Sequence, residues 1–133
     1  MIEMERKEEG FTLVEALVAM FLLAIGLLSV APMFVLGIRG AAASADMGIV
    51  TARATERLEV LRATGFASLP AGGSLTTNVA GYFDASRPDV TVRWTVTNNA
   101  TPATLKTIVV RAVATRQVLG QRKETTVSTR RGQ

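Results

Sequence analysis

An uncharged apolar run from Ala16 to Ile38 constrains this chain more than any other feature of its sequence. The run is 23 residues long, and at about 1.5 Å per residue a helix of that length crosses a hydrocarbon core of about 30 Å. The sequence therefore predicts one membrane-spanning helix near the amino terminus. A cleaved secretory signal peptide fits poorly, because the run is too long and the preceding MIEMERKEEG holds four acids against two bases.

The chain contains neither cysteine nor histidine. Disulfides, thiolate metal sites, imidazole ligands and the commonest general base are therefore excluded. We expect no catalytic residue, no metal and no cofactor. A structural or binding role is expected in place of enzymatic activity.

One carboxylate, Glu15, interrupts an apolar stretch that otherwise begins at Phe11. A charge inside a membrane helix costs about 2.5–3.5 kcal/mol on insertion scales, so it usually marks a function or a partner. An amine is the expected partner, because two opposite charges can offset each other's desolvation in a medium of low dielectric. The alternative is a carboxylate at the end of the helix that extends to the membrane surface.

The segment Gly10–Glu15, which reads GFTLVE and continues into the apolar run, resembles the processing motif of type IV prepilins. The motif combines a short charged leader ending in glycine, a phenylalanine, an acid four residues later and about twenty apolar residues. The resemblance implies that a prepilin peptidase cuts between Gly10 and Phe11 and that the new amino terminus of Phe11 is N-methylated. It also implies that Glu15 of an incoming subunit pairs with the Phe11 amine of a neighbour in a filament.

Helix signals continue past the apolar run to about Ala63. Pro32 lies inside the run, and we expect the helix to kink or loosen there, because proline removes a backbone hydrogen bond at a cost of about 3 kcal/mol. Pilins often carry a proline at the equivalent place, so the resemblance gives Pro32 a role in assembly. From residue 39 the pattern becomes amphipathic, with apolar residues at three- and four-residue steps. These are Met47, Val50, Ala54, Leu58 and Leu61.

The remaining residues predict a loop followed by an antiparallel sheet. Gly65–Pro88 is rich in glycine, serine, threonine and asparagine and is interpreted as loop. Alternating apolar and polar residues predict strands over Asp89–Thr97 and Leu105–Thr115, and a more polar edge strand over Arg122–Thr129. Gly120 is expected to turn the chain into that edge strand, and Trp94 to anchor the core between sheet and helix.

The expected fold class is α+β, with one long helix packed on an antiparallel sheet of three or four strands. This is also the ladle fold of the pilin family. We expect a leader over residues 1–10, a membrane and assembly half of the helix over 11–38 and an amphipathic half over 39–63. The amphipathic half and residues 64–133 are expected to form one globular domain.

The mature chain is expected to be strongly basic. Removal of the leader leaves 13 bases and 7 acids, which raises the net charge from +4 to +6. Basic side chains crowd the carboxy-terminal half, and a basic face can bind nucleic acid through its phosphates. The bases are spread along strands with few aromatic residues nearby, so a solvated sheet face or contacts with neighbouring subunits are favoured over nucleic-acid binding.

Within the family, the chain looks most like the V-type minor pilins, and the related minor pseudopilin of type II secretion is the alternative. A membrane-anchored periplasmic component of DNA uptake is a further alternative. The resemblance implies four kinds of partner: prepilin peptidase, other pilin subunits, an inner-membrane assembly platform and the membrane itself. It also implies a single-pass inner-membrane protein with a cytoplasmic amino terminus and a periplasmic domain, which then enters a pilus or pseudopilus.

Overall fold

The computed structural model describes residues 11–99, 104–118 and 120–133. The chain divides into two compact units, one ending at Ile38 and one covering Arg39–Gln133. A single α-helix, α1 (Leu13–Ala63), belongs to both units. The predicted helix therefore has the expected length, although it begins two residues after Phe11. The expected leader, residues 1–10, lies outside the described residues.

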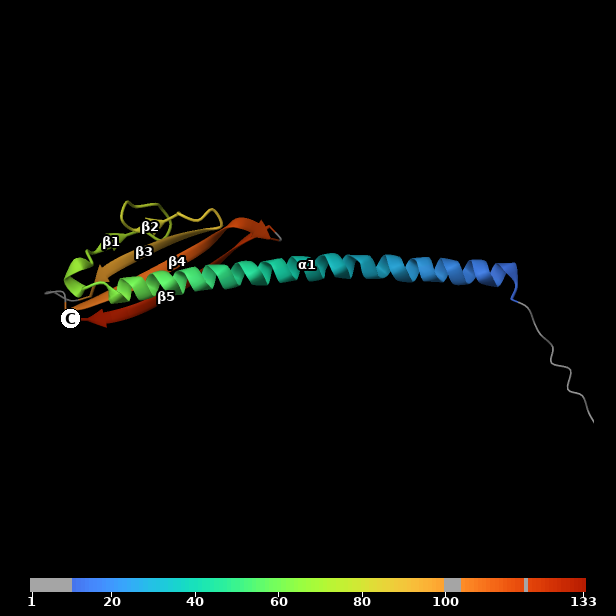
Figure 1. Ribbon diagram of the computed structural model, residues 1–133, viewed down its shortest axis with the longest axis horizontal. Helices are drawn as coiled ribbons and strands as arrows, with labels where there is room; N and C mark the ends of the chain where they lie inside the picture. Colours follow the sequence, from blue (N-terminus) through green and yellow to red (C-terminus); the bar gives the residue numbers. More distant parts are fainter. Residues whose placement is uncertain (1–10, 100–103, 119) are drawn as a thin grey trace, which may run out of the picture. The chain divides into compact units, whose positions relative to one another are not determined.

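The second unit contains an antiparallel sheet (Figure 1). Its long strands are β3 (Val90–Asn98), β4 (Leu105–Val118) and β5 (Gln121–Gly132). They lie in the order β3-β4-β5, so β5 is an edge strand, as the sequence predicts. Gly120 has a φ of 76° at the turn between β4 and β5, a left-handed conformation that glycine adopts without steric cost.

The sequence prediction missed three short elements in the segment interpreted as loop. A 3₁₀ turn occupies Phe66–Ser68, and two-residue strands β1 (Gly72–Gly73) and β2 (Phe83–Asp84) both pair with β3. The sheet therefore has five strands, not three or four. Elements this short carry no periodic signal, because a two-residue strand cannot show the alternation that identifies longer strands.

The core of the second unit lies between the amphipathic half of α1 and one face of the sheet (Figure 1). Register places the alternating side chains of β3 opposite those of β4 on the same face, for example Trp94 opposite Val110. The helix contributes Val50, Ala54, Leu58 and Leu61. The sheet contributes Val90, Val92, Trp94, Val96, Ile108, Val110, Ala112 and Ala114. The predicted core is confirmed except at its first helical position.

That exception is Met47, whose side chain is 40% exposed, whereas the neighbouring Asp46 is only 8% exposed. Asp46 lies one turn before Val50, so it continues the buried stripe at four-residue spacing. The sequence prediction placed Met47 there because it is apolar and lies three residues before Val50. Asp46 has a partner on β4, seventy residues away in the sequence.

Trp94 anchors the core as predicted and is 3% exposed. The Arg57 guanidinium carbon lies 3.9 Å from the centroid of its ring, a cation–π arrangement. Beside it, Gly73 has a φ of 93°, and a Cβ atom at Gly73 would lie only 2.2 Å from the Trp94 carbonyl oxygen. Only glycine therefore allows β1 to approach β3 this closely.

Two bases from the sheet hold the carboxy-terminal end of α1 and the turn that follows. Arg131 on β5 donates from Nη1 to the carbonyl oxygens of Arg62 and Thr64. Lys106 on β4, itself buried, donates from Nζ to the carbonyls of Phe66 and Leu69, at 2.6 Å each. The last carbonyls of a helix have no partner within it, and a cation there also interacts favourably with the helix dipole.

Candidate processing and assembly site

The described start of the chain is a capped helix end. Thr12 Oγ1 accepts a hydrogen bond from the Glu15 backbone N–H at 3.3 Å, and the Thr12 carbonyl accepts from Ala16 N–H at 3.1 Å. Thr12 is therefore the N-cap residue, and Glu15 is the third residue of α1. Threonine followed three residues later by glutamate is the sequence of a capping box. The Thr–Glu spacing in the sequence was the available signal for this role of Thr12, which was not predicted.

Glu15 consequently lies in the first turn of α1, not deep inside it. An acid in the first turn is stabilised by the partial positive charge of the helix amino terminus. Phe11 precedes the cap, and its side chain is 74% exposed. The structure thus places Phe11 and Glu15 at one end of the helix, on either side of the Thr12 cap. Gly10, the other residue of the expected cleavage site, lies outside the described residues.

The helix that follows presents apolar side chains all round. From Leu13 to Ile38, the large apolar residues of α1 are exposed within the chain. The most apolar 18-residue window of α1 has a mean hydropathy of 2.5, and none of it is buried. By length and composition α1 can cross a membrane, and it is the one such helix among the described residues. A helix that is apolar on every side needs lipid or other helices around it.

Helix α1 continues through Pro32 without a break. An unbroken helix can still bend at a proline, so the kink or loosening expected at Pro32 stays a prediction. A proline removes only its own N–H from the helical ladder. The side chains around Pro32 are exposed, so no neighbouring contact within the chain opposes the local adjustment that the ring needs.

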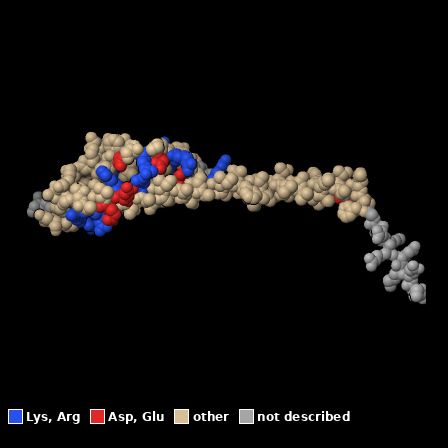
Figure 2. All heavy atoms as spheres, viewed as in Figure 1, with Lys and Arg blue, Asp and Glu red and all other residues tan. Residues whose placement is uncertain are grey.

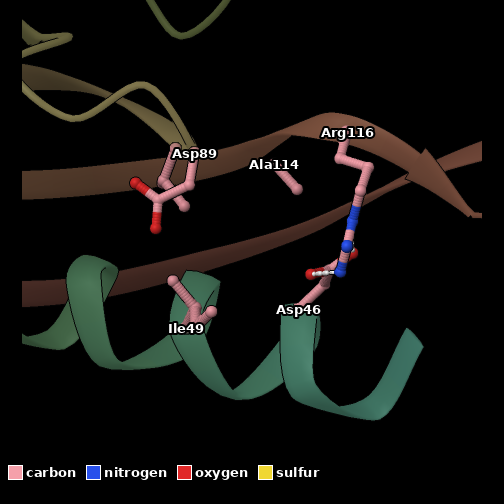
Figure 3. A pocket seen from close by; sticks show the side chains of 6 residues that line it. Asp46, Ile49, Asp89, Ala114 and Arg116 are labelled. Atoms are coloured by element: carbon pink, nitrogen blue, oxygen red, sulfur yellow. Dashed lines mark hydrogen bonds and ion pairs between the residues drawn. The ribbon is translucent and has the colours of Figure 1, made fainter. Parts of the chain in front are cut away.

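In the described part of the second unit, one ion pair joins helix to sheet. Arg116 on β4 donates from Nη2 to Asp46 Oδ1 at 2.5 Å and from Nε to Oδ2 at 3.1 Å (Figure 3). This hydrogen bond and the carboxylate charge raise the pKa of Arg116 above its usual value. The pair borders a cavity of about 280 Å³ whose other lining residues are Ile49, Asp89, Val90 and Ala114. No sequence pattern links Asp46 to Arg116, so the contact was not predicted.

Most basic residues of the carboxy-terminal half have partners within the chain. Arg116 pairs with Asp46, Arg111 pairs with Glu124 at 2.5 Å, and Arg93 donates to Asn78 at 2.8 Å. Lys106 and Arg131 bind the carbonyls after the helix, as described above. Figure 2 shows acidic and basic atoms intermixed over the second unit, whereas the helix of the first unit is almost entirely uncharged. Within the described residues, no group of three or more potential metal ligands occurs.

A comparison with protein-family models identifies residues 6–31 as a prokaryotic N-terminal methylation motif. The matched segment contains Phe11, the Thr12 cap, Glu15 and most of the exposed apolar helix. Together with the long helix and the antiparallel sheet, it fits a type IV pilin-like protein. The chain is type IV pilin-like.

For a pilin-like chain, the motif indicates a structural subunit that is processed at its amino terminus and anchored in a membrane. The motif covers only the amino-terminal part of the chain and does not separate pilins from pseudopilins. No match was found among curated proteins or among solved structures.

Proposed function

We propose that this chain is a minor type IV pilin that is cleaved between Gly10 and Phe11, N-methylated on Phe11 and assembled into a filament. The observation that carries the proposal is the methylation motif at the start of a helix whose apolar surface is uncovered within the chain. A helix of this kind is stable in lipid as a monomer and among other helices in a filament. Prepilin peptidase, other pilin subunits and an inner-membrane assembly platform are the proposed partners.

The proposed topology is a single pass through the inner membrane, with the amino terminus in the cytoplasm and Arg39–Gln133 in the periplasm. Cleavage then exposes a new ammonium group on Phe11. Glu15 of an incoming subunit pairs with that ammonium on a neighbour, so the two charges offset each other's cost in the apolar filament core. Pro32 has no backbone N–H, so one helical hydrogen bond is missing there. The helix can extend at this point on assembly.

Two features support this role for Glu15. Its place in the first turn keeps the carboxylate near the end of the helix at which the new amino terminus forms. The Thr12 cap already satisfies the Glu15 backbone N–H, so helix formation does not depend on the carboxylate alone. Substitution of Glu15 therefore changes assembly more than it changes the helix.

A Glu15 substitution series tests this step. Glu15→Ala is expected to insert and to be cleaved as the wild type is, but to be depleted by at least about tenfold from sheared filaments, because the apolar core then holds an unpaired ammonium. Glu15→Asp keeps the charge and serves as the matched control, with incorporation closer to the wild type. Wild-type incorporation of Glu15→Ala would refute the pairing role.

A minor pseudopilin of type II secretion is the alternative, because it shares the motif and the proposed assembly. Co-purification with a secretin and secretion-platform proteins would favour it, and co-purification with other minor pilins would favour the pilus. A membrane-anchored DNA-binding component of DNA uptake is less well supported, since many of the carboxy-terminal bases are used in contacts within the chain.

A further inference from the structure

The face of the sheet opposite α1, here called the outer face, contains a polar hollow of about 100 Å³. Its lining includes Thr91 and Arg93 from β3, Thr115 from β4 and Arg122 from β5. The other lining residues are Val113 and Ala114. Two arginines and two threonines thus line one small space, and no acidic residue is among the described residues that line it.

The register of the sheet leaves excess positive charge at this hollow. Arg93 lies directly opposite Arg111 on the outer face, and like charges in this position destabilise a pair of strands. Arg111 is compensated, because its Nη2 lies 2.5 Å from Glu124 and its Nη1 donates to the Leu75 carbonyl at 3.2 Å. Within the described part of the chain, neither Arg93 nor Arg122 forms an ion pair with a carboxylate.

One of the two arginine side chains that line the hollow is already held in position by a hydrogen bond within the chain. Arg93 Nε donates to Asn78 Oδ1 at 2.8 Å, which fixes the plane of the guanidinium group and leaves its terminal nitrogens as donors. The pairing of β4 with β5 shifts register between Val113 and Gln117, and Thr115 lies within that stretch. Bulges of this kind commonly redirect side chains beside binding sites.

We propose that this hollow binds a single phosphate group. Planar guanidinium groups bind both phosphate and carboxylate. Donors that come from three strands around one space suit the tetrahedral phosphate, with its three oxygens, better than the planar carboxylate, with its two. An extended nucleic-acid backbone fits less well, because it needs a row of free bases. The neighbouring Arg111 and Arg116 are already bound within the chain.

Equilibrium dialysis of the full-length protein in detergent micelles against radiolabelled orthophosphate tests the proposal. We expect saturable binding of about one phosphate per chain, weakened by added salt. Arg122→Gln is expected to raise the Kd at least about tenfold, because it removes a charged donor that is exposed and makes no ion pair in the described structure. Arg130→Gln is the matched control, since Arg130 is an exposed arginine on the same strand outside the hollow, and its Kd should stay within about twofold of the wild type.

Arg93→Lys provides a second variant, because it keeps the charge and removes the planar fork. It should also weaken phosphate binding, while Trp94 fluorescence confirms that the domain is folded. Equal Kd values for Arg122→Gln and Arg130→Gln, or no saturable binding by the wild type, would overturn the proposal. Binding of an unphosphorylated oligonucleotide without any binding of orthophosphate would overturn it as well, in favour of a nucleic-acid backbone site.

A 5′-phosphorylated oligonucleotide distinguishes the sources of the phosphate. If it competes with orthophosphate and its unphosphorylated form does not, the site accepts a terminal phosphate on a larger molecule and the proposal is supported. The proposal is independent of the assembly function. If a correctly cleaved and methylated protein does not bind phosphate, the phosphate site is refuted and the assembly function is unaffected.

Discussion

The two halves of α1 have the same backbone conformation and opposite surroundings. Up to Ile38 its large apolar side chains are exposed within the chain, whereas beyond Arg39 one stripe of the helix is buried against the sheet. Leu23 is 64% exposed and Leu58 only 8%. The comparison shows that the second half is held by its own chain, and that the first half depends on lipid or on other subunits.

The largest expected effect is the difference in unfolding free energy between truncating a leucine in the packed half of α1 and truncating one in the exposed half. Leu58→Ala should lower the free energy of unfolding of the second unit by about 2–5 kcal/mol, because it opens a cavity in the core. Leu23→Ala should change that free energy by less than about 0.5 kcal/mol, since Leu23 belongs to the other unit and its side chain is exposed within the chain. Urea titration of the protein in detergent, followed by Trp94 fluorescence, measures both. Equal losses would show that the two halves do not differ as described.

A pair of glycine substitutions sharpens the same contrast. Gly73→Ala should destabilise the second unit by about 1–3 kcal/mol, because it combines a left-handed φ with a Cβ too close to the Trp94 carbonyl. Gly26→Ala lies in the apolar half, where a new Cβ has no atom within 4 Å apart from its chain neighbours and the adjoining helix backbone. It should leave the urea midpoint unchanged. A wild-type midpoint for Gly73→Ala would mean that β1 does not lie against β3.

A smaller effect is expected at the end of the packed half. Arg131→Gln should cost about 1–2 kcal/mol, because it removes a charged donor from the carbonyls of Arg62 and Thr64. Hydrogen exchange should accelerate first in the last turn of α1. Arg130→Gln, one residue earlier on β5 and exposed, is the control and should leave that exchange unchanged.

The smallest effect is expected at Asp84. The Ser86 backbone N–H, which donates to this carboxylate at 2.9 Å, is the main cause that holds the pKa of Asp84 below its ordinary 3.8, and Arg57 and Arg53 lower it further. Because the folded pKa is the lower one, the contribution is present above pH 3.8 and is lost as the pH falls through the folded value. Asp84→Asn should therefore flatten the acid limb of the stability curve slightly. An unchanged acid limb would contradict this assignment.

Much of the fold could be predicted because its signals are periodic. The uncharged run to Ile38 predicted the exposed helix, and alternation predicted β3, β4 and β5. The three- and four-residue spacing from Val50 to Leu61 predicted the buried stripe. Each of these signals repeats over several turns or residue pairs, so a single deviation does not hide it.

What the sequence did not predict depends on contacts between distant residues or on very short elements. Asp46 was missed because its partner, Arg116, lies seventy residues away. β1 and β2 were missed because two residues cannot show a period. At the candidate site, Phe11 and Glu15 were found from the motif, whereas the Thr12 cap was overlooked and the outer-face hollow needed the register of three strands. The proposed roles of Gly10, Phe11, Glu15 and Pro32 remain predictions.

The central claim is that the uncovered half of α1 becomes an assembly segment once the leader is removed. The intact mass of the protein extracted from membranes tests it most directly. We predict a chain that lacks Met1–Gly10 and carries one additional methyl group on Phe11, and an uncut chain when the peptidase is absent. A membrane-extracted protein that retains Met1–Gly10 in cells with an active peptidase would contradict the account.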